Sequence, residues 1–239
     1  MKRVASTPQA RLILPVLCLV LLASGCSGLP RVTNHPAPQF TLNSVPFDQA
    51  GCSQSASGEL VCPPGSPLGD LGCSSLAAPG VYLGGLEPAY PLHLCWKDQE
   101  DGGYIYREGC LRPQYLNYIL WENNNFRVIH DREELAEMYA PIQTREEALS
   151  YAMAATGLAA YYDLQPVKSL RYFTKDLEDT HVEVTPEGYV VHLYAYALCG
   201  CGPHTTSAVP VLVRQDGRLE ELDRQPVYED PEQDNLCID

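Results

Sequence analysis

The clearest hydrophobic pattern in the chain is a helical repeat followed by stretches of strand alternation. From Thr144 to Ala159, small and apolar residues recur at helical spacing behind a Thr-x-x-Glu capping box. From His181 onward the period becomes two: residues 181–198 predict a strand, a turn and a strand, and residues 205–224 repeat that order. This order predicts an α+β domain over residues 113–239, with one main helix packed on an antiparallel β-meander.

Two shorter elements precede the main helix. Residues 115–129 predict a β-hairpin whose turn lies at Asn123–Asn125, because Asn tolerates the left-handed backbone of tight turns. A second capping-box pattern at Asp131 predicts a short helix that Pro141 ends.

The predicted strand over residues 189–198 has two different faces. Val191 and Leu193 alternate toward the helix, while His192 and Tyr194 lie on the opposite face. Such a tyrosine-lined face can bind a glycan or a peptide. Alternatively, another part of the chain covers it, and the cysteine-rich segment is the first candidate for that cover.

The region before residue 113 lacks helical periodicity. Residues 51–112 are rich in Cys, Gly and Pro, which predicts a loop-rich segment stapled by disulfides. Residues 26–50 carry several prolines and predict a tether. As a polyproline helix with a rise of about 3.1 Å per residue, residues 27–39 would hold the folded part up to about 40 Å from the bilayer. The alternative is that residues 40–47 lie on the domain as an edge segment.

The first 25 residues have the charge order of an export signal. Lys2, Arg3 and Arg11 precede an apolar run over residues 12–23. As a helix this run is about 18 Å long, which is too short for a hydrocarbon core of roughly 30 Å. We therefore expect a cleaved signal peptide over residues 1–25.

The end of that run, Ala23-Ser24-Gly25-Cys26, resembles the lipobox of bacterial lipoproteins. The resemblance implies cleavage before Cys26, a thioether-linked diacylglyceryl group on this cysteine, and acylation of the new amine. The departure from the family pattern is Ala23, where Leu is commonest. Because Ser27 is not Asp, the resemblance also implies sorting to the outer membrane in a Gram-negative cell.

The net charge of the chain limits the classes of molecule that it can bind. The expected signal carries three of the 16 basic residues and none of the 30 acidic ones, so the mature chain has a formal charge of −17. Such a charge argues against nucleic-acid binding and against adsorption on anionic lipid.

Eight cysteines remain after the signal and the lipidation site are set aside, and an even number in an exported chain predicts four disulfides. They are Cys52, Cys62, Cys73, Cys95, Cys110, Cys199, Cys201 and Cys237. The stretch Cys199-Gly-Cys201-Gly-Pro-His204 also suggests a zinc site or a redox thiol pair. We favour the alternative that Cys199 and Cys201 staple this turn to distant cysteines, such as Cys237 and one from the region 52–110.

The acidic stretch at Asp98–Asp101 differs from a calcium-binding EF-hand loop. Gly102 and Gly109 take positions where such a loop needs ligands. We expect an ordinary solvated loop, and the alternative is weak calcium binding.

Residues 144–225, with EEALSYA on the helix and VRQDGRLEEL on the closing hairpin, resemble PepSY-like and cystatin-like α+β modules. The resemblance implies a binding or inhibitory unit, and no hydrolase or nucleotide-binding motif accompanies it. We expect a lipid-anchored lipoprotein of the cell envelope that binds a protein, peptide or glycan and is not an enzyme. The alternatives are a metal or thiol-redox protein using Cys199, Cys201 and His204, and an inhibitor of an envelope or secreted enzyme.

Overall fold

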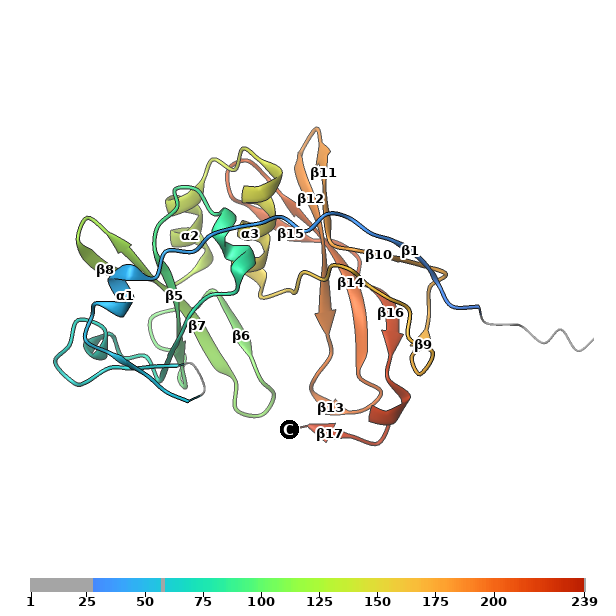
Figure 1. Cartoon of the computed structure of the whole chain (residues 1–239), viewed down its shortest axis with the longest axis horizontal. Helices are drawn as coiled ribbons and strands as arrows, with labels where there is room; N and C mark the ends of the chain where they lie inside the picture. Colours follow the sequence, from blue (N-terminus) through green and yellow to red (C-terminus); the bar gives the residue numbers. More distant parts are fainter. Residues whose placement is uncertain (1–27, 57–58, 239) are drawn as a thin grey trace, which may run out of the picture.

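Two antiparallel sheets lie on either side of a buried helix (Figure 1). The structure is a computed structural model that describes residues 28–56 and 59–238, so the expected signal peptide and Cys26 lie outside the described residues. The described chain is mostly strand with few helices, which agrees in outline with an α+β class. Among the described residues, no helix has the length and apolar character needed to cross a membrane.

The first sheet is built mainly from the region that was expected to be loop-rich. Its seven strands are β2 (Ser53–Gln54), β3 (Leu60–Val61), β4 (Ser75–Ala77), β5 (Leu92–Lys97), β6 (Tyr106–Glu108), β7 (Gln114–Glu122) and β8 (Asn125–Ile129). The β7–β8 hairpin is confirmed, with Asn123 and Asn124 at φ angles of 51° and 60°. The expected domain boundary at residues 112/113 falls inside this continuous sheet, because β5 and β6 both pair with β7. The strands of two or three residues, β2, β3, β4 and β6, show no period of their own and depend on non-local pairing.

The second sheet is a six-stranded assembly rather than one simple meander. Its strands are β9 (Arg171–Tyr172), β11 (His181–Thr185), β12 (Gly188–Tyr196), β14 (Thr205–Val213), β15 (Leu219–Glu221) and β16 (Gln225–Glu229). One edge of β14 pairs first with β16 and then with β15. Pro210 lies between these two partners, where its missing N–H group breaks no ladder bond.

The two helices that the capping patterns predict, α2 (Arg132–Tyr139) and α3 (Arg145–Thr156), begin at the expected residues. The Asp131 side chain accepts hydrogen bonds from two backbone N–H groups at the start of α2, and Thr144 accepts one at the start of α3. Helix α3 ends earlier than expected because Gly157 adopts a left-handed conformation at a φ of 72°. A Cβ atom there would lie 2.5 Å from the Tyr106 ring, so only glycine fits.

Helix α3 is the centre of one core shared by both sheets. Its small side chains, including Ala148, Ala152 and Ala155, are completely buried and allow the strands of both sheets to approach the helix closely. On one side lie Leu116 and Leu120 of β7, and on the other lie the inward-facing residues of β12 and β14. The two sheets therefore form a single packed unit around α3.

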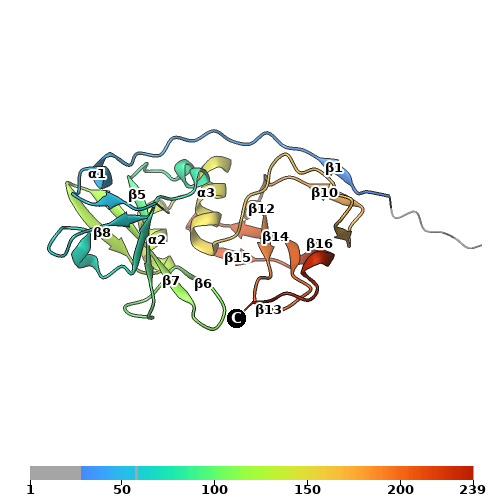
Figure 2. The ribbon, with the colours of Figure 1, turned by 60° about the horizontal axis from the view of Figure 1, so that its bottom comes forward.

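The expected tether is wrong as a free spacer. Residues 28–44 instead form a strap along the folded part, shown in blue in Figures 1 and 2. Its strand β1 (Arg31–Thr33) pairs in parallel with β10 (Asp176–Glu178). The strap leads into α1 (Val45–Asp48), where Phe47 is fully buried and stacks on His93. Apolar anchors inside a proline-rich stretch thus fix the strap to the surface.

Four disulfides confirm the expected framework. They join Cys52 to Cys62, Cys73 to Cys95, Cys110 to Cys199, and Cys201 to Cys237. The third joins the two sheets, and the fourth joins the short strands β13 (Gly200–Cys201) and β17 (Cys237–Ile238). The remaining elements are three 3₁₀ turns, η1 (Gly69–Leu71), η2 (Val81–Gly85) and η3 (Pro231–Gln233).

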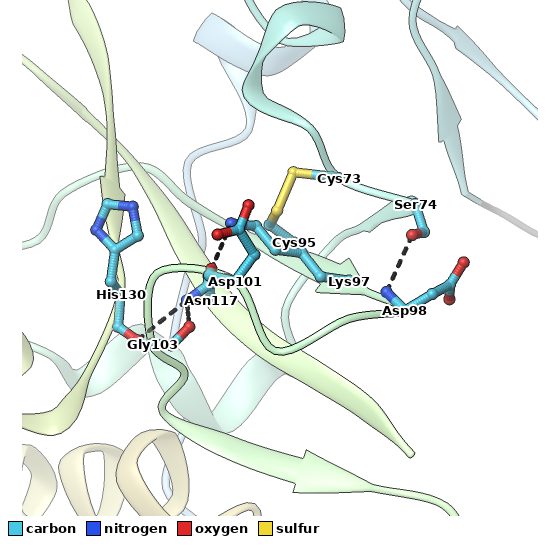
Figure 3. The surroundings of a disulfide bond; sticks show 9 residues. All are labelled: Cys73, Ser74, Cys95, Lys97, Asp98, Asp101, Gly103, Asn117 and His130. Carbon is cyan, nitrogen blue, oxygen red and sulfur yellow. Dashed lines mark hydrogen bonds between the residues drawn. A yellow bond between two sulfur atoms is a disulfide. The ribbon is translucent and has the colours of Figure 1, made fainter. Parts of the chain in front are cut away.

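The acidic loop after β5 is a hydrogen-bonded turn near the second disulfide (Figure 3). Buried Asn117 donates from its amide to the carbonyl oxygens of Gly103 and His130, at 3.1 Å each. The carboxylates of Asp98 and Asp101 point apart. This arrangement agrees with the expected solvated loop.

Candidate metal centre

The Cys199, Cys201 and His204 side chains are engaged separately. The two cysteines belong to different disulfides, one with Cys110 and the other with Cys237. The two ring nitrogens of His204 lie 2.9 and 3.1 Å from the carbonyl oxygens of Ala197 and Leu236, so the ring is held between these two backbone groups. In this oxidised form the turn offers no thiolate, which a zinc site on these two cysteines and thiol redox chemistry would both require.

A different set of metal-binding side chains converges at the outer face of β11 and β12. It comprises His181 and Glu183 of β11, His192 of β12, Glu178 of β10 and His35 of the strap. The three imidazole rings form a stack, with His181 in the middle. Its ring centroid lies 4.4 Å from that of His35 and 4.1 Å from that of His192.

Strand register explains why residues distant in sequence meet here. His181 and His192 are direct partners in the β11–β12 pair, so their side chains lie on the same face. Glu183 lies two residues after His181 and shares this face through the strand period of two. The β1–β10 pair then places His35 over the stack.

The best-formed ligand set consists of His181, Glu183 and His192. Glu183 Oε1 lies 3.6 Å from the Nε2 atom of each histidine. In a tetrahedral zinc site with Zn–N bonds of about 2.0–2.1 Å, neighbouring ligand atoms are about 3.4 Å apart. The His181 and His192 rings are stacked at an interplanar angle of 10°, so they must tilt relative to each other for both Nε2 lone pairs to point at one ion.

A backbone contact orients the central histidine. His181 Nδ1 lies 2.9 Å from the carbonyl oxygen of Asp179, so Nδ1 carries the proton and donates it. The lone pair is then on Nε2, which faces Glu183. Metal-binding histidines are commonly held in this way.

The surroundings of His192 favour the neutral form of its imidazole ring. Its Nε2 atom is buried and has no hydrogen-bond partner in the described part of the chain. Burial lowers the pKa of His192 and His181 lowers it further, whereas Glu183 acts in the opposite direction. A neutral imidazole with an unpartnered ring nitrogen is the form that binds a metal ion.

The Asp179 carboxylate fixes the surroundings of the centre. Asp179 is fully buried and accepts hydrogen bonds from the Asn34 side chain and from the backbone N–H groups of His35, Asp163 and Leu164. Burial alone would raise the pKa of Asp179, but these hydrogen bonds outweigh it and lower the pKa below 3.8. The ionised carboxylate therefore holds the strap against the second sheet.

A small cavity of about 180 Å³ adjoins the stack and is lined by His181, His192, Tyr194 and Pro226, among others. The expected tyrosine face is partly covered, because the Tyr161 ring stacks on Tyr194 with a centroid distance of 4.9 Å. The cover comes from the segment after α3 and not from the cysteine-rich segment.

This centre was not identified from the sequence, because His35, His181 and His192 are far apart in the sequence or lie on different strands. Part of the centre was nevertheless accessible from the predicted hairpin. Counting outward from its Pro-Glu turn, Thr185 pairs with Gly188, which places His181 opposite His192. The contribution of the strap depends on the β1–β10 pair, for which the sequence carries no local signal.

Comparisons with protein-family models, with curated proteins and with solved structures find no match for this chain.

Proposed function

We propose that the chain is a lipid-anchored protein of the cell envelope that binds a divalent cation of borderline softness, such as Zn²⁺, without catalysing a reaction. His181 and His192 provide imidazole nitrogens, and Glu183 provides a carboxylate oxygen. This mixed donor set suits zinc or copper better than calcium or magnesium, which prefer oxygen ligands alone. The observation that carries the proposal is the 3.6 Å spacing of Glu183 Oε1 from both Nε2 atoms.

Zinc titration of the disulfide-bonded mature protein tests this proposal. Isothermal titration calorimetry or equilibrium dialysis is expected to give one bound zinc per chain. The His130→Asn variant is a matched control, because His130 Nδ1 also lies near a glutamate, 3.2 Å from Glu134 Oε2, but outside the stack. Absence of a bound ion in both proteins would refute metal binding.

The envelope assignment rests on the lipobox at Cys26 and on the four disulfides, which form and persist in oxidising compartments. The lipidated amino terminus would hold the protein at a membrane, specifically the outer membrane in a Gram-negative host.

Replacing Cys26 with Ala is expected to release the protein from the membrane fraction or to block its processing, because the acyl chains supply permanent attachment. Cys18→Ala is the matched control and should leave membrane partition unchanged, since cleavage removes Cys18. Intact mass after alkylation without reduction should show the lipid on Cys26 and no free thiol. Unchanged membrane partition of Cys26→Ala would contradict the anchor, and alkylation at Cys199 and Cys201 would contradict their disulfide role.

A further inference from the structure

A basic and apolar surface surrounds the point where the described chain begins. We define the anchor-side surface as Leu29, Arg31, Lys168, Phe173 and Lys175, which line a surface hollow of about 820 Å³. Leu29 and Phe173 expose 44% and 52% of their area next to these basic groups. The strap begins at this end of the molecule, where its strand β1 lies beside β10 and near β9 (Figure 1).

The sign of charge on this surface is opposite to that of the protein. The mature chain has a formal charge of −17, yet three of its 13 basic residues lie on the anchor-side surface. Arg31 pairs with Asp176, but the ammonium groups of Lys168 and Lys175 have no ion pair with any described residue. Two uncompensated cations beside exposed apolar groups are suited to an anionic phospholipid bilayer.

Chain length ties this surface to the attachment point. Only Ser27 separates Cys26 from Gly28, so the Cα atoms of Cys26 and Gly28 lie at most about 7 Å apart. Because β1 pairs with β10, the strap cannot extend to hold the folded part away from the bilayer. A lipid on Cys26 therefore brings Gly28 and Leu29 close to the membrane interface.

We propose that the anchor-side surface docks on the bilayer that receives the Cys26 lipid, with Leu29 and Phe173 at the interface and Lys168 and Lys175 against anionic headgroups. The inference rests on the proposed lipidation of Cys26. The net charge argued against adsorption on anionic lipid, but the distribution of charge changes that conclusion locally. Repulsion of the acidic remainder by the same lipid favours the same orientation.

The test reconstitutes the full lipidated protein into phosphatidylethanolamine–phosphatidylglycerol vesicles whose acyl chains are brominated. The fluorescence that the new tryptophan adds in the Phe173→Trp protein should be shifted to shorter wavelength. Its intensity should be lower in brominated vesicles than in vesicles without bromine. The matched control is Leu111→Trp in the β6–β7 turn of the other sheet, where the original side chain is 77% exposed. The fluorescence of the new tryptophan in the Leu111→Trp protein should not be quenched by bromine. Adding Lys168→Glu and Lys175→Glu to Phe173→Trp should reduce the quenching.

The outcomes separate docking from lipidation. If mass spectrometry shows the lipid on Cys26 while Phe173→Trp stays unquenched, docking is wrong and the anchor stands. Equal quenching of the Phe173→Trp and Leu111→Trp proteins would also overturn docking. A mature protein without lipid on Cys26 would overturn the anchor and, with it, the premise of docking.

Discussion

The Asp179→Asn variant is expected to lose about 3 kcal/mol of the free energy of unfolding. The Asp179 carboxylate accepts four hydrogen bonds in a fully buried position, two of them from Asn34 and His35 of the strap. An amide of the same shape keeps one acceptor oxygen but turns an NH₂ group toward N–H donors. Buried donors are then left without acceptors, and each costs about 1–3 kcal/mol.

Urea denaturation with the disulfides intact measures this loss. Asp176→Asn is the matched control, because Asp176 makes a solvent-exposed ion pair with Arg31 and should contribute less than about 1 kcal/mol. Equal losses in the two variants would contradict the role assigned to Asp179.

The pH dependence of stability provides a second readout of the same carboxylate. Hydrogen bonds hold the pKa of Asp179 below its usual value of 3.8, despite burial. A group whose pKa is lowered in the folded state stabilises the protein fully above its unfolded pKa. That stabilisation is lost as the pH falls through the lowered pKa. The stability difference between the natural protein and Asp179→Asn should therefore be constant near neutral pH and shrink below about pH 4.

His181→Asn is expected to lower the affinity for zinc by about 100-fold or more. His181 is central to the stack, and its Nε2 atom is held toward Glu183 by the Nδ1 contact with the Asp179 carbonyl oxygen. Asparagine offers only a weak amide oxygen on a shorter side chain. Because the His181 side chain makes its ring contacts at a partly exposed face, its loss should leave the fold intact, as near-ultraviolet circular dichroism can check.

Competition binding of zinc against a chromophoric chelator measures the affinities of the His181→Asn, His130→Asn and natural proteins. The His130→Asn protein should bind as the natural one does. Zinc affinity should fall in acid as His192 protonates, which occurs below its usual range near 6.5 because burial lowers its pKa. Natural affinity in His181→Asn, or an equal loss in His130→Asn, would contradict the proposed site.

Local signals predicted the elements that depend on adjacent residues. The capping residues Asp131 and Thr144 marked both helix starts, and Asn123 and Asn124 marked a hairpin turn. These features need only a few neighbouring side chains and backbone angles, which the sequence displays directly.

Features that depend on distant pairing were missed. Four strands of the first sheet (β2, β3, β4 and β6) have only two or three residues each, and such strands are too short to show a period. The strap was taken as a spacer because it carries several prolines, although Phe47 and the β1–β10 pair dock it onto the fold. The metal centre needs both the hairpin register and the docked strap, so only the His181–His192 pair lay within reach of sequence reasoning.

X-ray absorption at the zinc edge of the loaded, disulfide-bonded protein tests the central claim most directly. The proposed site predicts nitrogen and oxygen ligands at about 2.0–2.2 Å, with the outer-shell scattering of two imidazole rings and no sulfur. The His181→Asn protein should lose one of those rings. A shell of sulfur at about 2.3 Å would instead place the ion on cysteines, and a shell without imidazole scattering would place it on surface carboxylates. Either result would contradict the assignment of His181, Glu183 and His192 as the metal-binding residues.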